Sequence, residues 1–206
     1  MSGSQTLSFL PTLPPEEAAR ADLYALLARL FATGPDEAVL SAIAGAQADF
    51  GADSPLGLAW TGLKSVARNG DAAAASLEHA EIFVGTGRAP VSIYASHYLS
   101  DQWKEMTVVE LRDRLPQLGL ARQAGVSQPE DHLAALLEVM CYLVRRGNDA
   151  AGMAAQREFF ERYLGPWSAR FCTEVGEQAG SIFYRAAASM LQAFLAIEAE
   201  GFSLES

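Results

Sequence analysis

The sequence predicts an all-α protein, folded as a compact bundle of about eight to ten helices. Alanine is abundant and β-branched residues never gather into alternating runs, so the periodic signals are helical almost throughout. Half of the 206 residues are hydrophobic and 19% are charged, a composition too apolar for a disordered chain. We therefore expect residues 1–206 to form a single helical domain with a sizeable core.

Four helices are predicted before the first loop, and most have their own start signal. Pro14 and Pro15 open the first, Ser54 caps the third, and Asp71 caps the fourth. The predicted ranges are 14–33, 36–50, 55–69 and 71–84. The residues expected to face the core are Leu23, Leu26, Leu27, Leu30, Phe31, Val39, Leu40, Ile43, Leu56, Trp60, Leu63, Ala67, Ala74, Leu77, Ile82 and Phe83.

The periodic pattern breaks at residues 85–93, GTGRAPVSI, which contain two glycines and a proline and are expected to form a loop. A short aromatic segment, IYASHYL, comes next. Thr107 and Glu110 then form a Thr-x-x-Glu capping box, which predicts the start of a helix interrupted by Pro116. A second loop is expected around Gly125.

Further helices are predicted over residues 130–146, 149–164, 167–175 and 181–200. Their apolar stripes are Leu133, Leu136, Leu137, Met140 and Val144; Met153, Phe159, Phe160 and Tyr163; Trp167 and Phe171; and Ile182, Phe183, Met190, Leu191, Phe194 and Ile197. A seam near residues 119–129 divides two candidate subdomains, 1–125 and 126–206, joined by a hinge. Because Gly119 and Gly125 give freedom there, two chains could exchange their C-terminal helices, so the protein is expected as a monomer or a domain-swapped dimer.

The net charge of −10 disfavours nucleic acids and anionic membranes as partners, because both attract clustered Lys and Arg. A basic peptide is the more natural partner for such a surface. The sequence has no run of 18 apolar residues and no targeting pattern at its start, so we expect a cytoplasmic protein without a membrane span. Cys141 and Cys172 are expected to be buried, reduced thiols.

The motifs of common enzymes and metal proteins are missing, so we expect neither catalysis nor a bound metal. There is no Glu-x-x-His pair for di-iron, no His-Glu-x-x-His, no Cys-x-x-Cys and no Gly-x-Ser-x-Gly. GLAWTGLKS has the glycine spacing of a P-loop, but Leu63 occupies the lysine position. Gly85-Thr86-Gly87-Arg88 is not a dinucleotide fingerprint, although its amides and Arg88 leave weak nucleotide binding open.

Three stretches, taken in order, carry a resemblance to a known family. They are EHAEIFVGTGRAPVSIYASHYL (78–99), PEDHLAALLEVMCYL (129–143) and FFERYLGPWSARF (159–171), followed by a helix containing FYRAAASMLQAFL. Their order, spacing and residue types resemble the TorD/DmsD/NarJ family of redox-enzyme maturation chaperones. The chain departs from the family pattern at His79, Ile93 and Tyr163.

The resemblance implies an all-helical cytoplasmic chaperone, not an enzyme. It would bind the twin-arginine signal peptide of a molybdenum-containing oxidoreductase, and often the apoprotein, until the molybdopterin cofactor is inserted. By similarity, the client-binding residues are Glu78, Phe83, Gly85, Tyr94, Ser96, Tyr98, Asp131 and His132.

Simpler structural roles stay open for these residues. Asp131, placed in the first turn of the helix over 130–146, would favour the helix dipole, and could also meet a basic group of the client while His132 donates a hydrogen bond. Tyr94, Tyr98 and Trp103 either pack in the core or line an apolar groove. Two other functions also stay open: a nucleotide-binding assembly factor using residues 85–88, and a structural helical subunit of a redox complex.

Overall fold

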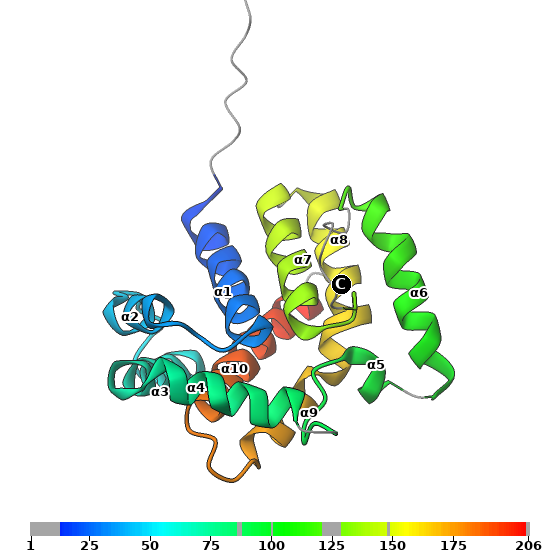
Figure 1. Ribbon diagram of the computed structural model, residues 1–206. Helices are drawn as coiled ribbons and strands as arrows, with labels where there is room; N and C mark the ends of the chain where they lie inside the picture. Colours follow the sequence, from blue (N-terminus) through cyan, green and yellow to red (C-terminus); the bar gives the residue numbers. More distant parts are fainter. Residues whose placement is uncertain (1–12, 86–87, 100, 121–128, 148, 205–206) are drawn as a thin grey trace, which may run out of the picture.

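The computed structural model describes residues 13–85, 88–99, 101–120, 129–147 and 149–204, with the backbone alone described for 101–107. Within these residues the chain is helices and loops, joined at one point by an isolated antiparallel bridge (Figure 1). The predicted all-α bundle is confirmed. No described helix is long and apolar enough to cross a membrane.

The elements are arranged along the chain in a simple order. They are α1 (Pro15–Ala32), α2 (Glu37–Gly45), α3 (Pro55–Asn69), α4 (Ala72–His79), the π-helical segment η1 (Ala80–Val84), α5 (Ala95–Tyr98), α6 (Asp101–Gln117), α7 (Leu133–Arg146), α8 (Ala150–Phe159), the π-helical segment η2 (Phe160–Leu164), α9 (Gly165–Gly176) and α10 (Phe183–Leu204).

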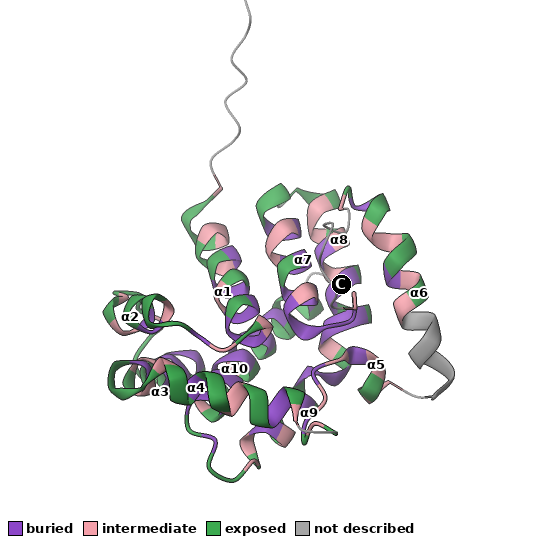
Figure 2. Ribbon diagram, in the orientation of Figure 1, coloured by how far each residue is buried: buried purple, intermediate pink, exposed green. Residues whose placement is uncertain are grey.

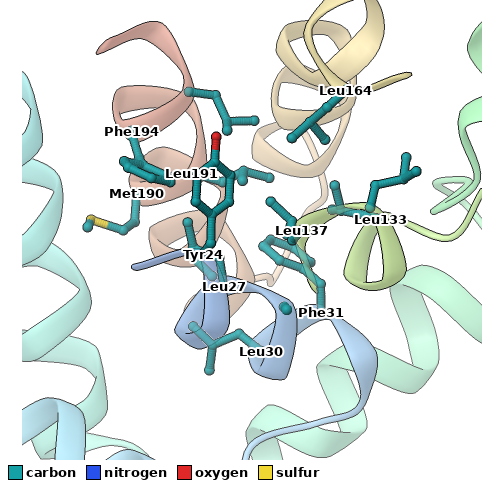
Figure 3. Close-up of a cluster of buried hydrophobic side chains, with 14 of the residues drawn as sticks. Tyr24, Leu27, Leu30, Phe31, Leu133, Leu137, Leu164, Met190, Leu191 and Phe194 are labelled. Atoms are coloured by element: carbon teal, nitrogen blue, oxygen red, sulfur yellow. The ribbon is translucent and has the colours of Figure 1, made fainter. Parts of the chain in front are cut away.

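One hydrophobic core joins the two halves of the chain. Helix α1 packs along α7, and α10 packs against α3 and α9. Figure 3 shows side chains of α1, among them Tyr24 and Leu27, close to Leu137 of α7 and Leu191 of α10. The buried faces of these helices point toward the middle of the molecule (Figure 2). The candidate subdomains 1–125 and 126–206 therefore share their apolar interior.

The predicted hinge falls partly beyond the residues that the structure describes. Gly119 has a φ of 81°, in the left-handed region that glycine favours. Gly125 and the rest of residues 121–128 lie outside the described residues. The exchange of C-terminal helices between two chains stays a prediction.

Local start signals in the sequence predicted the starts of α3 and α4. Ser54 Oγ accepts the N–H of Gly57 at 2.9 Å, and an Asp71 carboxylate oxygen accepts the N–H of Ala73 at 2.8 Å. Both side chains satisfy amides that have no partner inside the helix.

Several predicted helix boundaries were wrong, three of them with consequences for the packing or the site. The helix expected over 36–50 ends at Gly45, where Lys64 Nζ of α3 donates to the carbonyl of Ala46 at 2.6 Å and satisfies a C-terminal carbonyl. Helix α6 begins at Asp101, six residues before the predicted capping box. Helix α7 begins at Leu133 and not at residue 130, because the side chain of His132 caps it.

The predicted inward faces failed in two places. Ala74 and Leu77 are exposed, and Ala75 is buried instead. Leu77 and Phe83 are six residues apart, which places them roughly 240° apart around a regular helix, so the two could not face the core together. Ile182, which immediately precedes α10, is 68% exposed, and Ile197 on α10 is 49% exposed.

A buried polar cluster at Glu198 replaces the expected contact of Ile197. Arg20 Nε donates to Glu198 Oε1 at 2.7 Å, and the Tyr24 hydroxyl donates to Glu198 Oε2 at 2.6 Å. Arg20 Nη1 also donates to Gln156 Oε1 at 2.8 Å. Burial, reinforced by Glu198, raises the pKa of Tyr24 well above its usual range. The cluster ties α1 to α8 and α10.

The two cysteines are free thiols, as expected, but only Cys172 is fully buried. Burial raises its thiol pKa to about 12, so it stays protonated at neutral pH. Cys141 is half-buried, which corrects the prediction for that residue.

Candidate functional site

Two adjoining hollows lie among the loop after η1, helices α5 and α6, and the segment before α7. Figure 1 shows where α5 and α6 lie in the molecule. The first, about 460 Å³, is lined by Phe83, Val84, Arg88, Ala89, Pro90, Ser92, Tyr94 and His97. The second, about 800 Å³, is lined by Ser92, Tyr94, Ser96, His97, Val108, Val109, Arg112, Pro129 and Asp131. Because Ser92, Tyr94 and His97 belong to both, the hollows form one surface depression, here called the Tyr94 trough.

The floor of the Tyr94 trough is fixed by backbone hydrogen bonds between two distant segments. Tyr94 and His132 form the isolated antiparallel bridge. The N–H of Ala95 donates to the carbonyl of Asp131 at 3.0 Å, and the N–H of Leu133 donates to the carbonyl of Ile93 at 3.0 Å. The loop of the first half is therefore joined to the start of α7.

Asp131 is turned into the protein. It is 1% exposed, and its Oδ2 accepts the N–H of Ser96 at 3.0 Å. The carboxylate thus caps the short helix α5. It precedes α7 and does not lie in that helix's first turn, which corrects the sequence-based placement.

His132 is the residue that caps α7. Its Nδ1 accepts the N–H of Ala134 at 3.1 Å, so the neutral ring carries its proton on Nε2. Burial, and secondarily the charge of His79, lowers the pKa of His132 to about 4. The ring is 4% exposed and neutral at pH 7.

The two candidate tyrosines occupy different places. Tyr94 is half-buried, lines both hollows, and packs edge-on against His132 with ring centroids 5.3 Å apart. Tyr98 stacks on Trp167 at 5.2 Å, and its hydroxyl donates to the Ser92 carbonyl (2.8 Å) or the Glu174 carboxylate (2.9 Å). Burial raises the pKa of Tyr98 above its usual range. Tyr98 thus holds the backbone of a trough residue from behind. The side chain of Trp103 lies outside the described residues.

Phe83 forms part of the core beneath the first hollow. It is 6% exposed, with ring centroids 5.2 Å from Tyr184, 5.9 Å from Phe171 and 6.0 Å from Phe31. It therefore belongs to an aromatic cluster contributed by α1, α9 and α10.

Gly85 makes the turn that ends η1. Its φ is 64°, and its N–H donates to the carbonyl of Ala80 at 2.8 Å. A Cβ atom here would lie 3.0 Å from the Cα of Ala89. The position therefore needs glycine for both its backbone angle and the close approach.

Glu78 lies at the start of α10 rather than in the trough. Its carboxylate accepts the N–H groups of Ile182 at 3.1 Å, Phe183 at 3.0 Å and Tyr184 at 3.2 Å. Three amides at the beginning of α10 are thus satisfied by one side chain from α4.

The sequence did not single out the residues of the second hollow's wall. Val109 is 54% exposed, and Arg112 Nε lies 3.2 Å from Glu130 Oε2. Helix α6 is held by the buried Leu111 and by an ion pair between Arg114 and Glu158 of α8, at 2.6 Å. An exposed valine on a largely polar helix has no distinctive sequence pattern. The sequence therefore gave no sign that α6 would form a wall of the second hollow.

The remaining candidate chemistry is limited. Arg88 is exposed and lines the first hollow, whereas Thr86 and Gly87 lie outside the described residues. Among the residues described, no group of three or more His, Cys, Asp or Glu side chains is arranged to hold a metal ion.

Comparison with known proteins identifies the family. The family model described as nitrate reductase delta subunit matches residues 50–173. Chaperone protein TorD of Shewanella sp. (strain MR-4) is 30% identical, over 86% of this chain and 90% of that protein. The chain belongs to the TorD/NarJ family. The resemblance found in the sequence is confirmed, and all of its candidate client-binding residues lie within the matched stretch.

Other relatives of this TorD/NarJ-family chain agree. Chaperone protein TorD of Shewanella loihica is 27% identical, over 90% of this chain and 94% of that protein. A crystal structure of an Archaeoglobus fulgidus protein assigned to redox enzyme maturation superposes with a TM-score of 0.59 at 20% identity, covering 94% of this chain and 99% of that one. That likeness shows the shared all-helical fold. These two TorD relatives are named as chaperones and not as catalysts.

Proposed function

We propose that this protein is a cytoplasmic maturation chaperone, which binds the twin-arginine signal peptide, the apoprotein, or both, of a molybdenum-containing oxidoreductase. It holds the client until the molybdenum cofactor has been inserted and releases it for export. The observation that carries the proposal is the Tyr94 trough, a surface depression on a chain whose curated relatives are named chaperones.

The lining of the Tyr94 trough suits an extended peptide with an apolar stretch. Val84 and Val109, both more than half exposed, stand in different hollows, with Tyr94 shared between the two. Ser92 and Ser96 add hydroxyl groups that can pair with a peptide backbone. An apolar lining with a few polar groups is the usual composition of a recognition groove.

The expected affinity can be obtained from a simple estimate. Burying three or four leucine-sized anchors contributes roughly 1.5 to 3 kcal/mol each, before association and ordering costs of several kcal/mol. At the upper end of this range the remainder is about −8 kcal/mol, which corresponds to a Kd of about 1 μM and not much tighter. Such reversibility suits a chaperone that must release its client.

Electrostatic attraction would act mainly over a distance. The net charge of −10 favours the approach of a basic peptide and loses strength as salt screens it. Within the Tyr94 trough the charges have both signs, since Arg88 and Arg112 line it together with the inward-turned Asp131.

Titration of the purified protein with a fluorescent twin-arginine signal peptide of a molybdoenzyme tests the proposal. We expect a Kd of about 1 μM and a loss of about tenfold or more with Tyr94→Ala, which removes an aromatic anchor. Tyr142→Ala is the control, because Tyr142 is also half-buried but does not line the trough.

Three results would contradict the proposal. They are the absence of binding to the wild-type protein, equal losses in both variants, or unchanged affinity in both. Light scattering on the same samples would report whether the chaperone is a monomer or a domain-swapped dimer.

A further inference from the structure

We propose that Asp131 is a positioning residue of the Tyr94 trough, which acts on the client by holding helix α5 in place and forms no ion pair with the client's basic groups. The inference rests on the proposed function, because it concerns how the same trough binds its peptide. It assigns Asp131 a role different from the direct contact that the family resemblance implies.

Asp131 already binds two backbone amides of α5. Its Oδ2 accepts the N–H of Ser96 at 3.0 Å, and its backbone carbonyl accepts the N–H of Ala95 at 3.0 Å. These are the first two amides of α5, which have no acceptor inside so short a helix. Tyr94, the N-cap residue of α5, provides no capping side chain of its own.

Helix α5 is too short to be stable without contacts from the rest of the chain. It has four residues, far fewer than an isolated helix needs in water. Its C-terminal residue, Tyr98, is fixed by stacking on Trp167 at 5.2 Å and by its hydroxyl group near Glu174. Asp131 fixes the opposite end. The helix is therefore clamped at both ends by residues from elsewhere in the chain.

Helix α5 and the residue before it provide side chains that line the Tyr94 trough. Ser96 and His97 lie on α5, and Tyr94 immediately precedes it; all three line the Tyr94 trough. His97 is exposed, and Tyr94 and Ser96 are half-buried, so a peptide can reach them. Moving α5 would move all of them together.

The carboxylate of Asp131 is not accessible to a client side chain. Asp131 borders the second hollow but is only 1% exposed. Because the carboxylate is this buried, a client guanidinium could reach it only if α5 and the start of α7 moved apart, which would break the contact between Oδ2 and the N–H of Ser96. That amide would then lose its acceptor, which is costly for a partly buried group.

A double-mutant cycle between protein and peptide tests the inference. The probes are a synthetic twin-arginine signal peptide and its Gln-Gln counterpart, titrated against the wild type, Asp131→Ala and Asp131→Asn. We expect Asp131→Ala to weaken both peptides equally, by about tenfold, which equals about 1.4 kcal/mol. Asp131→Asn should restore both affinities to within about twofold, because its amide oxygen can still accept the N–H of Ser96.

Asp113→Asn controls for the loss of one negative charge, because Asp113 is exposed on α6. The inference is overturned if Asp131→Asn lowers the affinity for the arginine peptide by more than Asp113→Asn does, while the affinity for the Gln-Gln peptide stays unchanged. It is also overturned if Asp131→Ala binds both peptides like the wild type. Asp131→Asn keeps the test decisive if Asp131→Ala does not fold. Binding of neither peptide by the wild type would overturn the proposed function itself.

Discussion

Replacing Glu78 by alanine should destabilise the protein by loosening the start of α10. The substitution removes the acceptor of the N–H groups of Ile182, Phe183 and Tyr184, which lie 3.0 to 3.2 Å from the carboxylate. Loss of an N-cap typically costs about 0.5 to 2 kcal/mol, and loss of a negative charge near a helix N-terminus about 0.3 to 1 kcal/mol. We expect the free energy of unfolding to fall by about 2 kcal/mol.

Urea denaturation followed by circular dichroism at 222 nm measures this change. In thermal unfolding the same loss should lower Tm by about 4 to 8 °C for a chain of this size. Glu78→Gln retains one acceptor oxygen and should lose about half as much stability as Glu78→Ala. Glu81→Ala is the matched control, because Glu81 is exposed on the next segment of the same helical run.

The reasoning would be refuted if Glu78→Ala and Glu81→Ala had equal effects on the free energy of unfolding. Client binding separates the capping role from the contact implied by the family resemblance. If Glu78→Gln folds normally but loses affinity for the signal peptide, Glu78 contacts the client as well as capping α10.

Three further predictions concern stability. Lowering the pH from 6.5 to 4 should cost about 3 kcal/mol at His132, because its folded pKa is about 4 and the unfolded ring takes up a proton near pH 6.5. Stability from this group is thus fully present above pH 6.5 and lost on acidification, and His132→Asn should remove that pH dependence. Gly85→Ala should cost about 1 to 3 kcal/mol, because φ is 64° and the new Cβ would crowd Ala89. Glu198→Ala should cost about 3 kcal/mol, because the largely buried Arg20 would keep Glu17 but lose Glu198 as an ion-pair partner, and the Tyr24 hydroxyl would lose its acceptor.

Each of these predictions has a control measured by the same denaturation assay. Gly62→Ala has open space around its Cβ within α3 and should stabilise by up to about 1 kcal/mol, the opposite sign to Gly85→Ala. Asp22→Ala breaks an exposed ion pair and should cost no more than about 1 kcal/mol. Equal effects within either pair would contradict the corresponding argument. The argument for His132 would be contradicted if the unfolding free energy of His132→Asn depended on pH as strongly as that of the wild type.

Features encoded by neighbouring residues could be predicted from the sequence. Ser54 and Asp71 cap helices as expected, because each accepts a backbone N–H two or three residues ahead. The all-helical class was predicted from the same local signals. The end of α2 could not be predicted, since Lys64 from the next helix satisfies its terminal carbonyl.

The sequence indicated where the candidate site lies but not the role of each residue in it. The resemblance pointed to Tyr94 and Ser96, and both line the Tyr94 trough. It could not separate these from Glu78 and Asp131, whose carboxylates cap α10 and α5 through contacts between distant segments. No periodicity or spacing encodes such pairings. Likewise, the expected inward face of α4 was wrong, because Ala75 is buried and Leu77 is exposed.

Affinity capture from a lysate of the protein's own cells, with mass spectrometry of the bound proteins, tests the central claim most directly. The wild type and Tyr94→Ala would be compared, with Tyr142→Ala as the control. The account predicts that an uncleaved twin-arginine precursor of a molybdenum oxidoreductase is enriched with the wild type and Tyr142→Ala but is lost with Tyr94→Ala. Enrichment of only the mature, signal-cleaved enzyme, to the same extent with all three proteins, would contradict the account and indicate a structural subunit instead.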